Sequence, residues 1–230
     1  MKLRTQKWLK LVPLEILITA IVFILALFTF SLIVHEAVYE REDVFDSSVI
    51  RYFAVHATPQ FIAAMKSITF LGSTSFLLPA YLVLILWLLF VRKPQQAFDI
   101  AVVAISSTAM MFALKEFFKR QRPALPIIKN VSGYSFPSGH SLSSFIFCTV
   151  LIYLVWNGHW PKPVKVLVIL LLVLLALTIG LSRVVLNVHY ATDVIGGLCL
   201  GMIWAIISFF LIRKLRKKTI QGDTGVGRKG

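Results

Sequence analysis

The chain has 230 residues, 58% of them hydrophobic, and its 24 Lys and Arg against 10 Asp and Glu give a formal net charge of +14. A soluble domain of this length would need a far more polar surface, so the composition excludes that class and indicates an integral membrane protein. The basic residues lie mainly in short segments beside apolar runs. This placement argues against a nucleic-acid-binding face and is typical of membrane topology signals.

Six apolar runs are candidates for membrane-spanning helices. They cover residues 12–34, 70–91, 97–118, 141–156, 164–181 and 191–212. The first run is too long for a secretory signal and lacks a small-residue cleavage site, so we expect it to be retained. We therefore predict an all-α, polytopic membrane protein with a six-transmembrane-helix bundle over residues 1–218. We expect residues 219–230 to form a disordered cytoplasmic tail.

The basic residues of the short flanks predict the orientation of the bundle. With six spans they all fall on one side, and they are Lys2, Arg4, Lys7, Lys10, Arg92, Lys93, Lys162, Lys165, Arg213, Lys214, Arg216, Lys217 and Lys218. The positive-inside rule then places both termini in the cytoplasm, in a plasma-membrane protein. Between the first two spans, apolar residues at helical spacing on either side of Thr58 and Pro59 predict two short helices at the outer surface.

Polar residues collect at the outer ends of three spans, and the first cluster is KEFFKRQRP. Lys115 and Arg122 are seven apart, so on one continuing helix they would point the same way, with Lys119 between them and Pro123 ending the helix. These cations break the positive-inside pattern, which favours a functional role. The alternative is that they reach to outer-leaflet headgroups.

The second cluster is PSGH, directly before the fourth span. Ser138 is a good N-cap, and Gly139 leaves the first free amides unshielded, a combination that suits a phosphate group. His140 follows, with a titration range suited to proton transfer. The alternative is a helix cap with no further role.

The third cluster is SRVVLNVHYATD, in which Ser182 and Arg183 close the fifth span. His189 and Asp193 lie four residues apart, a spacing that puts them on one helix face. A carboxylate there can orient the imidazole and leave its other nitrogen free to attack. The alternative is an ordinary His–Asp helix pair.

Together the clusters supply fixed cations, a helix N-terminus, two histidines and one carboxylate, the parts that phosphoryl transfer needs. No separate set of metal-binding carboxylates is visible in the sequence. In order they read K-x6-R-P, P-S-G-H and S-R-x5-H-x3-D, which resembles the three signature motifs of the type 2 phosphatidic acid phosphatase superfamily. The six-span layout is similar to its membrane branch, and the length is most similar to the bacterial phosphatidylglycerophosphatase B subfamily.

The resemblance implies a metal-independent lipid phosphate phosphatase without cofactors, whose active site faces the extracytoplasmic side. His189 would attack phosphorus to form a phosphohistidine, Asp193 would orient it and His140 would protonate the leaving group. The phosphate would be held by Lys115, Arg122, Ser138, Gly139 and Arg183. Lys119, Arg120 and Tyr190 lie beside motif positions and are left outside this site.

The resemblance names phosphatidylglycerol phosphate as the substrate, with phosphatidate, lysophosphatidate and undecaprenyl pyrophosphate as further lipid phosphates. A dedicated undecaprenyl pyrophosphate phosphatase is the alternative within this class. Two other classes remain open: a transporter that binds anionic headgroups without chemistry, and a metallohydrolase with His140, His189 and Asp193 as ligands. The expected partners are the bilayer and its lipid phosphates, with no nucleic acid and no obligate protein partner.

Overall fold

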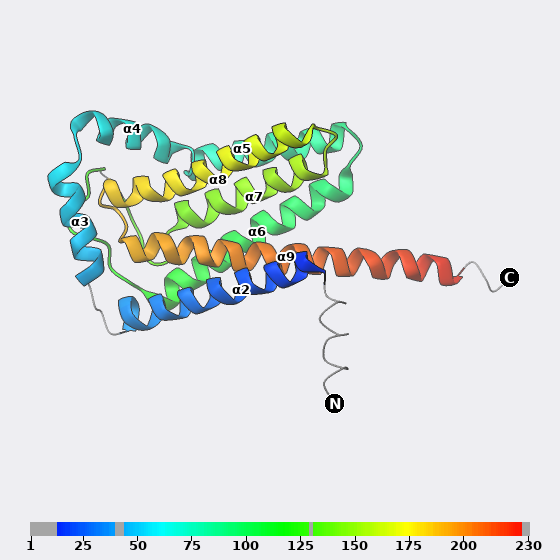
Figure 1. Cartoon of the computed structure of the whole chain (residues 1–230), viewed down its shortest axis with the longest axis horizontal. Helices are drawn as coiled ribbons and strands as arrows, with labels where there is room; N and C mark the ends of the chain where they lie inside the picture. The colour runs from blue at the N-terminus through cyan, green and yellow to red at the C-terminus, as the bar shows by residue number, and fades with distance from the viewer. Residues whose placement is uncertain (1–12, 40–43, 129–130, 227–230) are drawn as a thin grey trace.

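The computed structural model describes residues 13–39, 44–128 and 131–226, and this part of the chain is helical apart from its connections. Long helices run side by side, and one short helix lies across an end of the bundle (Figure 1). The elements are α2 (Leu14–Ile33), its π-helical continuation η1 (Val34–Tyr39), α3 (Val44–His56), α4 (Pro59–Phe70), α5 (Thr74–Phe90), α6 (Pro94–Phe118), α7 (Gly139–Asn157), α8 (Lys162–Val185) and α9 (Ala191–Val226).

The predicted all-α polytopic fold is confirmed. Five stretches are long and apolar enough to cross a membrane, namely Leu14–Tyr39, Pro94–Phe118, Gly139–Asn157, Lys162–Val185 and Ala191–Arg216. A sixth arises if α4 and α5, bent by 41° at their junction, form one broken span. Residue 12 of the first expected span lies outside the described residues, as do Lys2, Arg4, Lys7 and Lys10. The division at residue 218 stays a prediction, although α9 continues to Val226.

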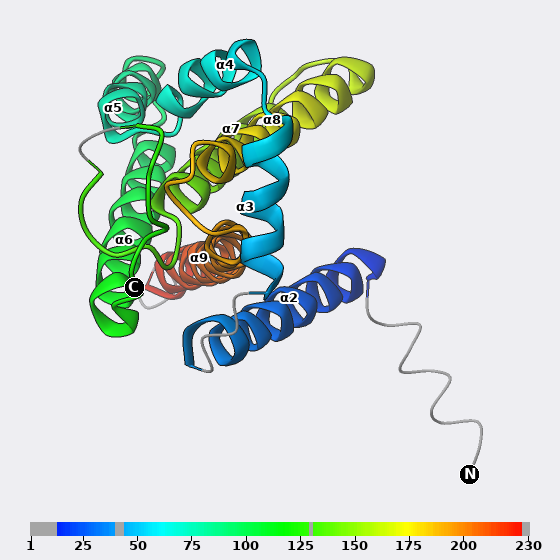
Figure 2. The same ribbon diagram turned by 90° about the vertical axis from the view of Figure 1, so that its left-hand side faces the viewer.

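Two short helices, α3 and α4, lie on either side of Thr58, as the apolar spacing indicated. The Thr58 hydroxyl accepts a hydrogen bond from the backbone N–H of Phe61, and Pro59 occupies the first helical position, where its missing N–H costs nothing. α3 contacts α8 and α9, and Figure 2 shows it lying across their ends. The segment between the first two spans is thus packed onto the bundle.

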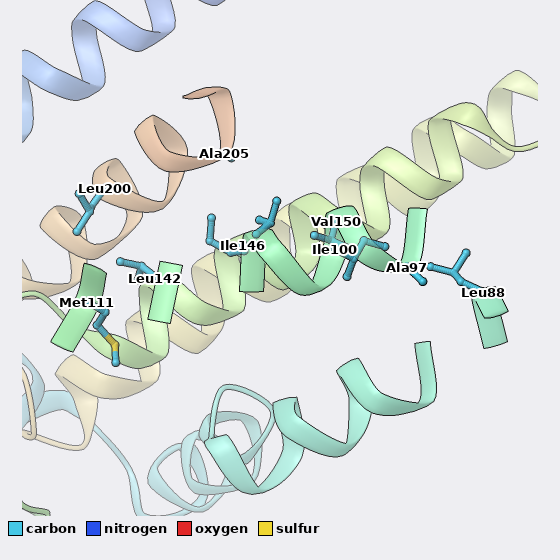
Figure 3. Packing of buried hydrophobic residues seen from close by; sticks show 10 residues of the cluster. Leu88, Ala97, Ile100, Met111, Leu142, Ile146, Val150, Leu200 and Ala205 are labelled. Carbon is cyan, nitrogen blue, oxygen red and sulfur yellow. The ribbon is translucent and has the colours of Figure 1, made fainter. Parts of the chain in front are cut away.

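The buried core is built around α7, which packs against α6, α8 and α9. Leu142, Ile146 and Val150 project from α7 and pack with Ile100 of α6 and Leu200 of α9 (Figure 3). Many large apolar side chains on the bundle's outer surface are exposed instead, as expected for helices that face lipid.

Glycine allows α9 to approach the start of α7 closely. A Cβ atom at Gly197 would stand 2.7 Å from the carbonyl oxygen of Ser138, a backbone atom that cannot move aside cheaply. The backbone N–H of Ser138 also donates to the carbonyl oxygen of Asp193 at 3.0 Å. This contact brings the second and third polar clusters together.

Candidate active site

The three polar clusters meet at one end of the bundle. α6 carries Lys115 in its last turn there, α7 begins beside His140 and α8 ends just after Arg183, while α9 begins just after His189 (Figure 1). His140 lies within interaction range of Lys115 and Arg122 from the first cluster and of Arg183 and His189 from the third. Residues from all three motifs therefore share one site.

The start of α7 is built as the sequence indicated. The buried Ser138 hydroxyl accepts hydrogen bonds from the backbone N–H of Ser141 at 3.4 Å and from the Ser141 hydroxyl at 2.9 Å. Gly139 lies directly beside α6, where a Cβ atom would stand 2.7 Å from the Met111 sulfur and 3.9 Å from Cε of Lys115. The positive end of the α7 dipole therefore lies near the Lys115 side chain, an arrangement that favours anion binding.

The chain reaches Arg122 by a different route from the one we predicted. The expectation of one helix continuing to Pro123 is wrong, because α6 ends at Phe118 and Lys119 adopts the left-handed conformation with φ 49°. A left-handed residue turns the chain away from the helix axis, so the spacing of seven does not align Lys115 with Arg122. Lys119 is exposed and does not join the cations of the site.

Arg122 enters the site from the loop and is held there by backbone carbonyls. Its Nε donates to Gly133 at 2.9 Å, its Nη2 to Ser132 at 3.1 Å and its Nη1 to Val188 at 2.8 Å. Nη1 also lies 3.0 Å from Nε2 of His189. These contacts fix the guanidinium in front of the imidazole.

Two further cations, Lys115 and Arg183, lie in the same site. Nζ of Lys115 donates to the carbonyl oxygen of Tyr134 at 2.5 Å, and Nη1 of Arg183 donates to the hydroxyl of Thr69, on α4, at 2.7 Å. Nε of Arg183 is buried and has no hydrogen-bond partner among the residues that the structure describes. A buried donor left unpaired costs about 1–3 kcal/mol, and an oxygen of a bound phosphate would satisfy it.

His189, which is 2% exposed, is held as a neutral imidazole. Because the Arg122 guanidinium can only donate, Nε2 of His189 is the acceptor and the ring proton sits on Nδ1. Nδ1 faces the Ser135 hydroxyl at 3.3 Å and Oδ2 of Asp193 at 3.5 Å. Burial lowers the pKa of His189 to about 4 although Asp193 acts in the opposite direction, so Nε2 keeps its lone pair at neutral pH.

Asp193 meets His189 through a turn and not across a helix face. α9 begins at Ala191, so His189 precedes the helix and the predicted shared face does not exist. The Tyr190 N–H donates to Oδ2 of Asp193 at 2.8 Å, and the Ser135 hydroxyl donates to the same oxygen at 2.5 Å. The two side chains still face each other because this turn folds the carboxylate back toward the imidazole.

Four residues that the motif analysis left out lie in or directly behind this site. They are Ser135, which contacts both His189 and Asp193, and Arg120, Asp46 and Thr192, which form a hydrogen-bonded group with Asp193. Arg120 had a signal in the sequence, since it is a further cation on the side that the positive-inside rule leaves poor in charge. Asp46 had no such signal, because it is one of several acidic residues in the segment after the first span.

The donors present favour an anion over a metal ion. Among the described residues, no group of three or more His, Cys, Asp or Glu side chains is placed to hold a metal ion. The described site instead contains the N-terminus of α7, the acceptor Nε2 of His189 and three cations, which are Lys115, Arg122 and Arg183. This arrangement can bind a phosphate group and present a neutral nitrogen nucleophile to it.

Comparison with known proteins agrees with this chemistry. Residues 96–217 match the PAP2 superfamily. The chain is 31% identical to phosphatidylglycerophosphatase B of Bacillus subtilis (strain 168), over 84% of this chain and 94% of that protein. It is 28% identical to a candidate undecaprenyl-diphosphatase of Escherichia coli (strain K12), over 73% of this chain and 83% of that protein.

The fold is likewise similar to a solved structure. A crystal structure of a transmembrane PAP2-type phosphatidylglycerolphosphate phosphatase from Bacillus subtilis superposes with a TM-score of 0.71 at 29% identity. The match covers 87% of this chain and 96% of that one. The similarity therefore extends beyond the motifs to the arrangement of the helices.

Proposed function

Because the chain belongs to the PAP2 superfamily and is a membrane lipid phosphatase, we propose that it hydrolyses the phosphomonoester of phosphatidylglycerol phosphate. The observation that carries this choice is the 31% identity to phosphatidylglycerophosphatase B over nearly the whole of that protein. Phosphatidate and lysophosphatidate present the same phosphomonoester on an apolar tail, so we expect phosphate release from both.

In the proposed mechanism, Nε2 of His189 attacks phosphorus. A P–N bond forms, the P–O bond to the lipid breaks, and His140, which enters this step as an imidazolium, gives its proton to the departing oxygen. Water then attacks the phosphohistidine, His140 takes back a proton, and the P–N bond breaks to release inorganic phosphate. Asp193 orients the His189 ring and balances the positive charge that develops on it.

The remaining predicted site residues bind the phosphate oxygens in this proposal. Lys115, Arg122 and Arg183 supply positive charge, and Ser138 and Gly139 form the start of α7, where the positive end of the helix dipole lies. The unpaired Nε of Arg183 and the positions of Lys115, Arg122 and Arg183 around His140 support these roles. No step of the mechanism uses a metal ion or cofactor.

We further infer that both termini lie in the cytoplasm and that the site faces the extracytoplasmic side of the plasma membrane. Arg92, Lys93 and Lys162 lie at helix ends opposite the site, where the positive-inside rule expects cytoplasmic charge. Cysteines introduced at residues 93 and 125 would test this. A membrane-impermeant thiol reagent should label only the second one in intact cells.

A second substrate, undecaprenyl pyrophosphate, is favoured by the similarity to the Escherichia coli relative. The same site would attack its terminal phosphate and release an undecaprenyl phosphate. A non-catalytic lipid transporter would need the cations but has no use for a neutral imidazole aligned with a carboxylate. The His189–Asp193 arrangement therefore favours an enzyme.

Phosphate release by purified protein in detergent with EDTA tests the proposal. Phosphatidylglycerol phosphate, phosphatidate and undecaprenyl pyrophosphate are compared, with His189→Ala as the inactive variant and His159→Ala, which removes an exposed histidine, as the matched control. We expect release in EDTA from wild type and the control but not from His189→Ala. No release by folded wild-type protein would favour the transporter, and loss of release in EDTA alone would favour the metallohydrolase.

A further inference from the structure

A buried ion-pair network lies behind Asp193, on the side away from His189. Nη1 of Arg120 donates to Oδ1 of Asp193 at 2.7 Å, and Nη2 of Arg120 donates to Oδ2 of Asp46 at 2.8 Å. Asp193 is 0% exposed and Asp46 is 1% exposed. One guanidinium therefore bridges two carboxylates that have no access to water.

Asp46 is anchored to the residue that precedes Asp193. Its Oδ1 accepts the backbone N–H of Thr192 at 2.9 Å, and its Oδ2 accepts the Thr192 hydroxyl at 2.5 Å. The Thr192 hydroxyl in turn accepts from Nη1 of Arg120 at 2.8 Å. The ring of Tyr190 lies 4.3 Å from the guanidinium carbon, so Arg120 is held by a cation–π contact as well.

Stability alone gives a poor reason for this network. Two carboxylates and one guanidinium are costly to bury, and apolar side chains of the same volume usually stabilise a fold as well or better. Burial alone would lower the pKa of Arg120, but Asp193 and Asp46 more than offset it and raise the pKa. The guanidinium thus remains a permanent positive charge against the carboxylate that faces His189.

We propose that Arg120 is a positioning residue for Asp193, and that Asp46 on α3 positions Arg120. The inference rests on the proposed function, because it takes Asp193 as the group that orients His189. Arg120 and Ser135 hold opposite oxygens of the carboxylate, so the oxygen that faces the imidazole cannot rotate away. Asp46 lies outside residues 96–217, the part that matches the family, so α3 contributes to the reaction from beyond that region.

Four variants test the network: Arg120→Gln, Arg120→Lys, Asp46→Asn and the double variant Asp46→Asn/Arg120→Gln. The matched control is Arg51→Gln, which removes an exposed arginine from the same helix as Asp46. The measurements are kcat per folded protein, KM and inhibition by vanadate, which stands in for phosphate. Unfolding temperature is recorded in parallel, so that loss of folded protein is not read as loss of rate.

We expect kcat of Arg120→Gln to fall by about 100-fold, the order seen when a reacting group is misplaced by about 1 Å. Vanadate inhibition should stay near the wild-type value, because Lys115, Arg122 and Arg183 are untouched. Arg120→Lys should recover part of the rate by keeping the charge. Asp46→Asn should slow the enzyme less than Arg120→Gln, and the two losses should be less than additive in the double variant, because Asp46 and Arg120 belong to one hydrogen-bonded network.

Three results would overturn the inference. They are a normal kcat in folded Arg120→Gln, a parallel loss of vanadate inhibition that makes Arg120 a phosphate-binding residue, and additive losses in the double variant. If Arg120→Gln does not fold, Arg120→Lys and Asp46→Asn decide by the same criteria, since a normal kcat in both would refute the role. Failure of the proposed function is a separate outcome, because it would show as an inactive wild type or an active His189→Ala.

Discussion

Replacement of Asp193 by Asn removes one negative charge and keeps the size of the side chain, so it tests the carboxylate itself. Three donors converge on the two oxygens: the Ser135 hydroxyl at 2.5 Å, Nη1 of Arg120 at 2.7 Å and the Tyr190 N–H at 2.8 Å. Nδ1 of His189 lies 3.5 Å away. An amide has only one acceptor oxygen, so its NH2 group must face donors whichever way it turns.

The size of the effect follows from that mismatch. If the NH2 group faces Arg120, the guanidinium loses its buried hydrogen-bond acceptor. If it faces Tyr190 and His189, it meets the N–H of Tyr190 and the N–H at Nδ1 of His189. His189 is then driven to the tautomer with its proton on Nε2. Breaking a buried ion pair by removing one partner costs about 3–5 kcal/mol. The wrong tautomer lowers kcat by about 10⁴-fold in a comparable His–carboxylate pair.

The assay is kcat and KM for phosphate release from phosphatidylglycerol phosphate in mixed micelles, with vanadate inhibition and unfolding temperature measured on the same protein. We expect a loss of kcat in Asp193→Asn of about 10⁴-fold with vanadate inhibition retained, because the phosphate-binding cations remain. A kcat within about tenfold of wild type would refute the tautomer argument and make Asp193 a structural residue.

Burial lowers the pKa of His189 to about 4 in the folded protein, against about 6.5 in the unfolded chain. Between these two pH values the unfolded chain binds more protons than the folded protein. The free energy of unfolding of the wild type, relative to His189→Gln, should therefore rise with pH in this range. Unfolding in detergent across that range measures the rise, and a flat difference would contradict it. Gly197→Ala should destabilise the fold by about 1–3 kcal/mol, because its Cβ would stand 2.7 Å from the Ser138 carbonyl oxygen. The control is Gly158→Ala, which should cost less because a Cβ there has no neighbour nearer than 3.3 Å. Equal unfolding temperatures of the two variants would refute this. Lys115→Ala should weaken vanadate inhibition by about 10- to 100-fold through loss of a charged phosphate contact, and a change confined to membrane insertion would assign Lys115 to topology.

The membrane class and the helical spans could be read from local composition. A run of about 20 apolar residues has few stable alternatives to a spanning helix, whatever its neighbours are. The N-cap at Ser138 and the short helices around Thr58 depend on a few adjacent residues and were also predicted correctly. The predicted span 97–118 ends where α6 ends, but the expected helical continuation to Pro123 does not form, because Lys119 adopts a left-handed turn without the Gly or Asn that usually indicates one.

The chain by itself thus determined the bundle and the chemical inventory of the site, since hydropathy and motif spacing are properties of consecutive residues. Only the tertiary structure decided which nitrogen of His189 carries the proton, because that depends on Arg122 and Asp193, which approach from different segments. It alone decided that α3 brings Asp46 to Arg120 and so to Asp193. Arg120 is separated by 74 positions from Asp46 and by 73 positions from Asp193, so both contacts depend on how the helices pack, and no local sequence pattern predicts that packing.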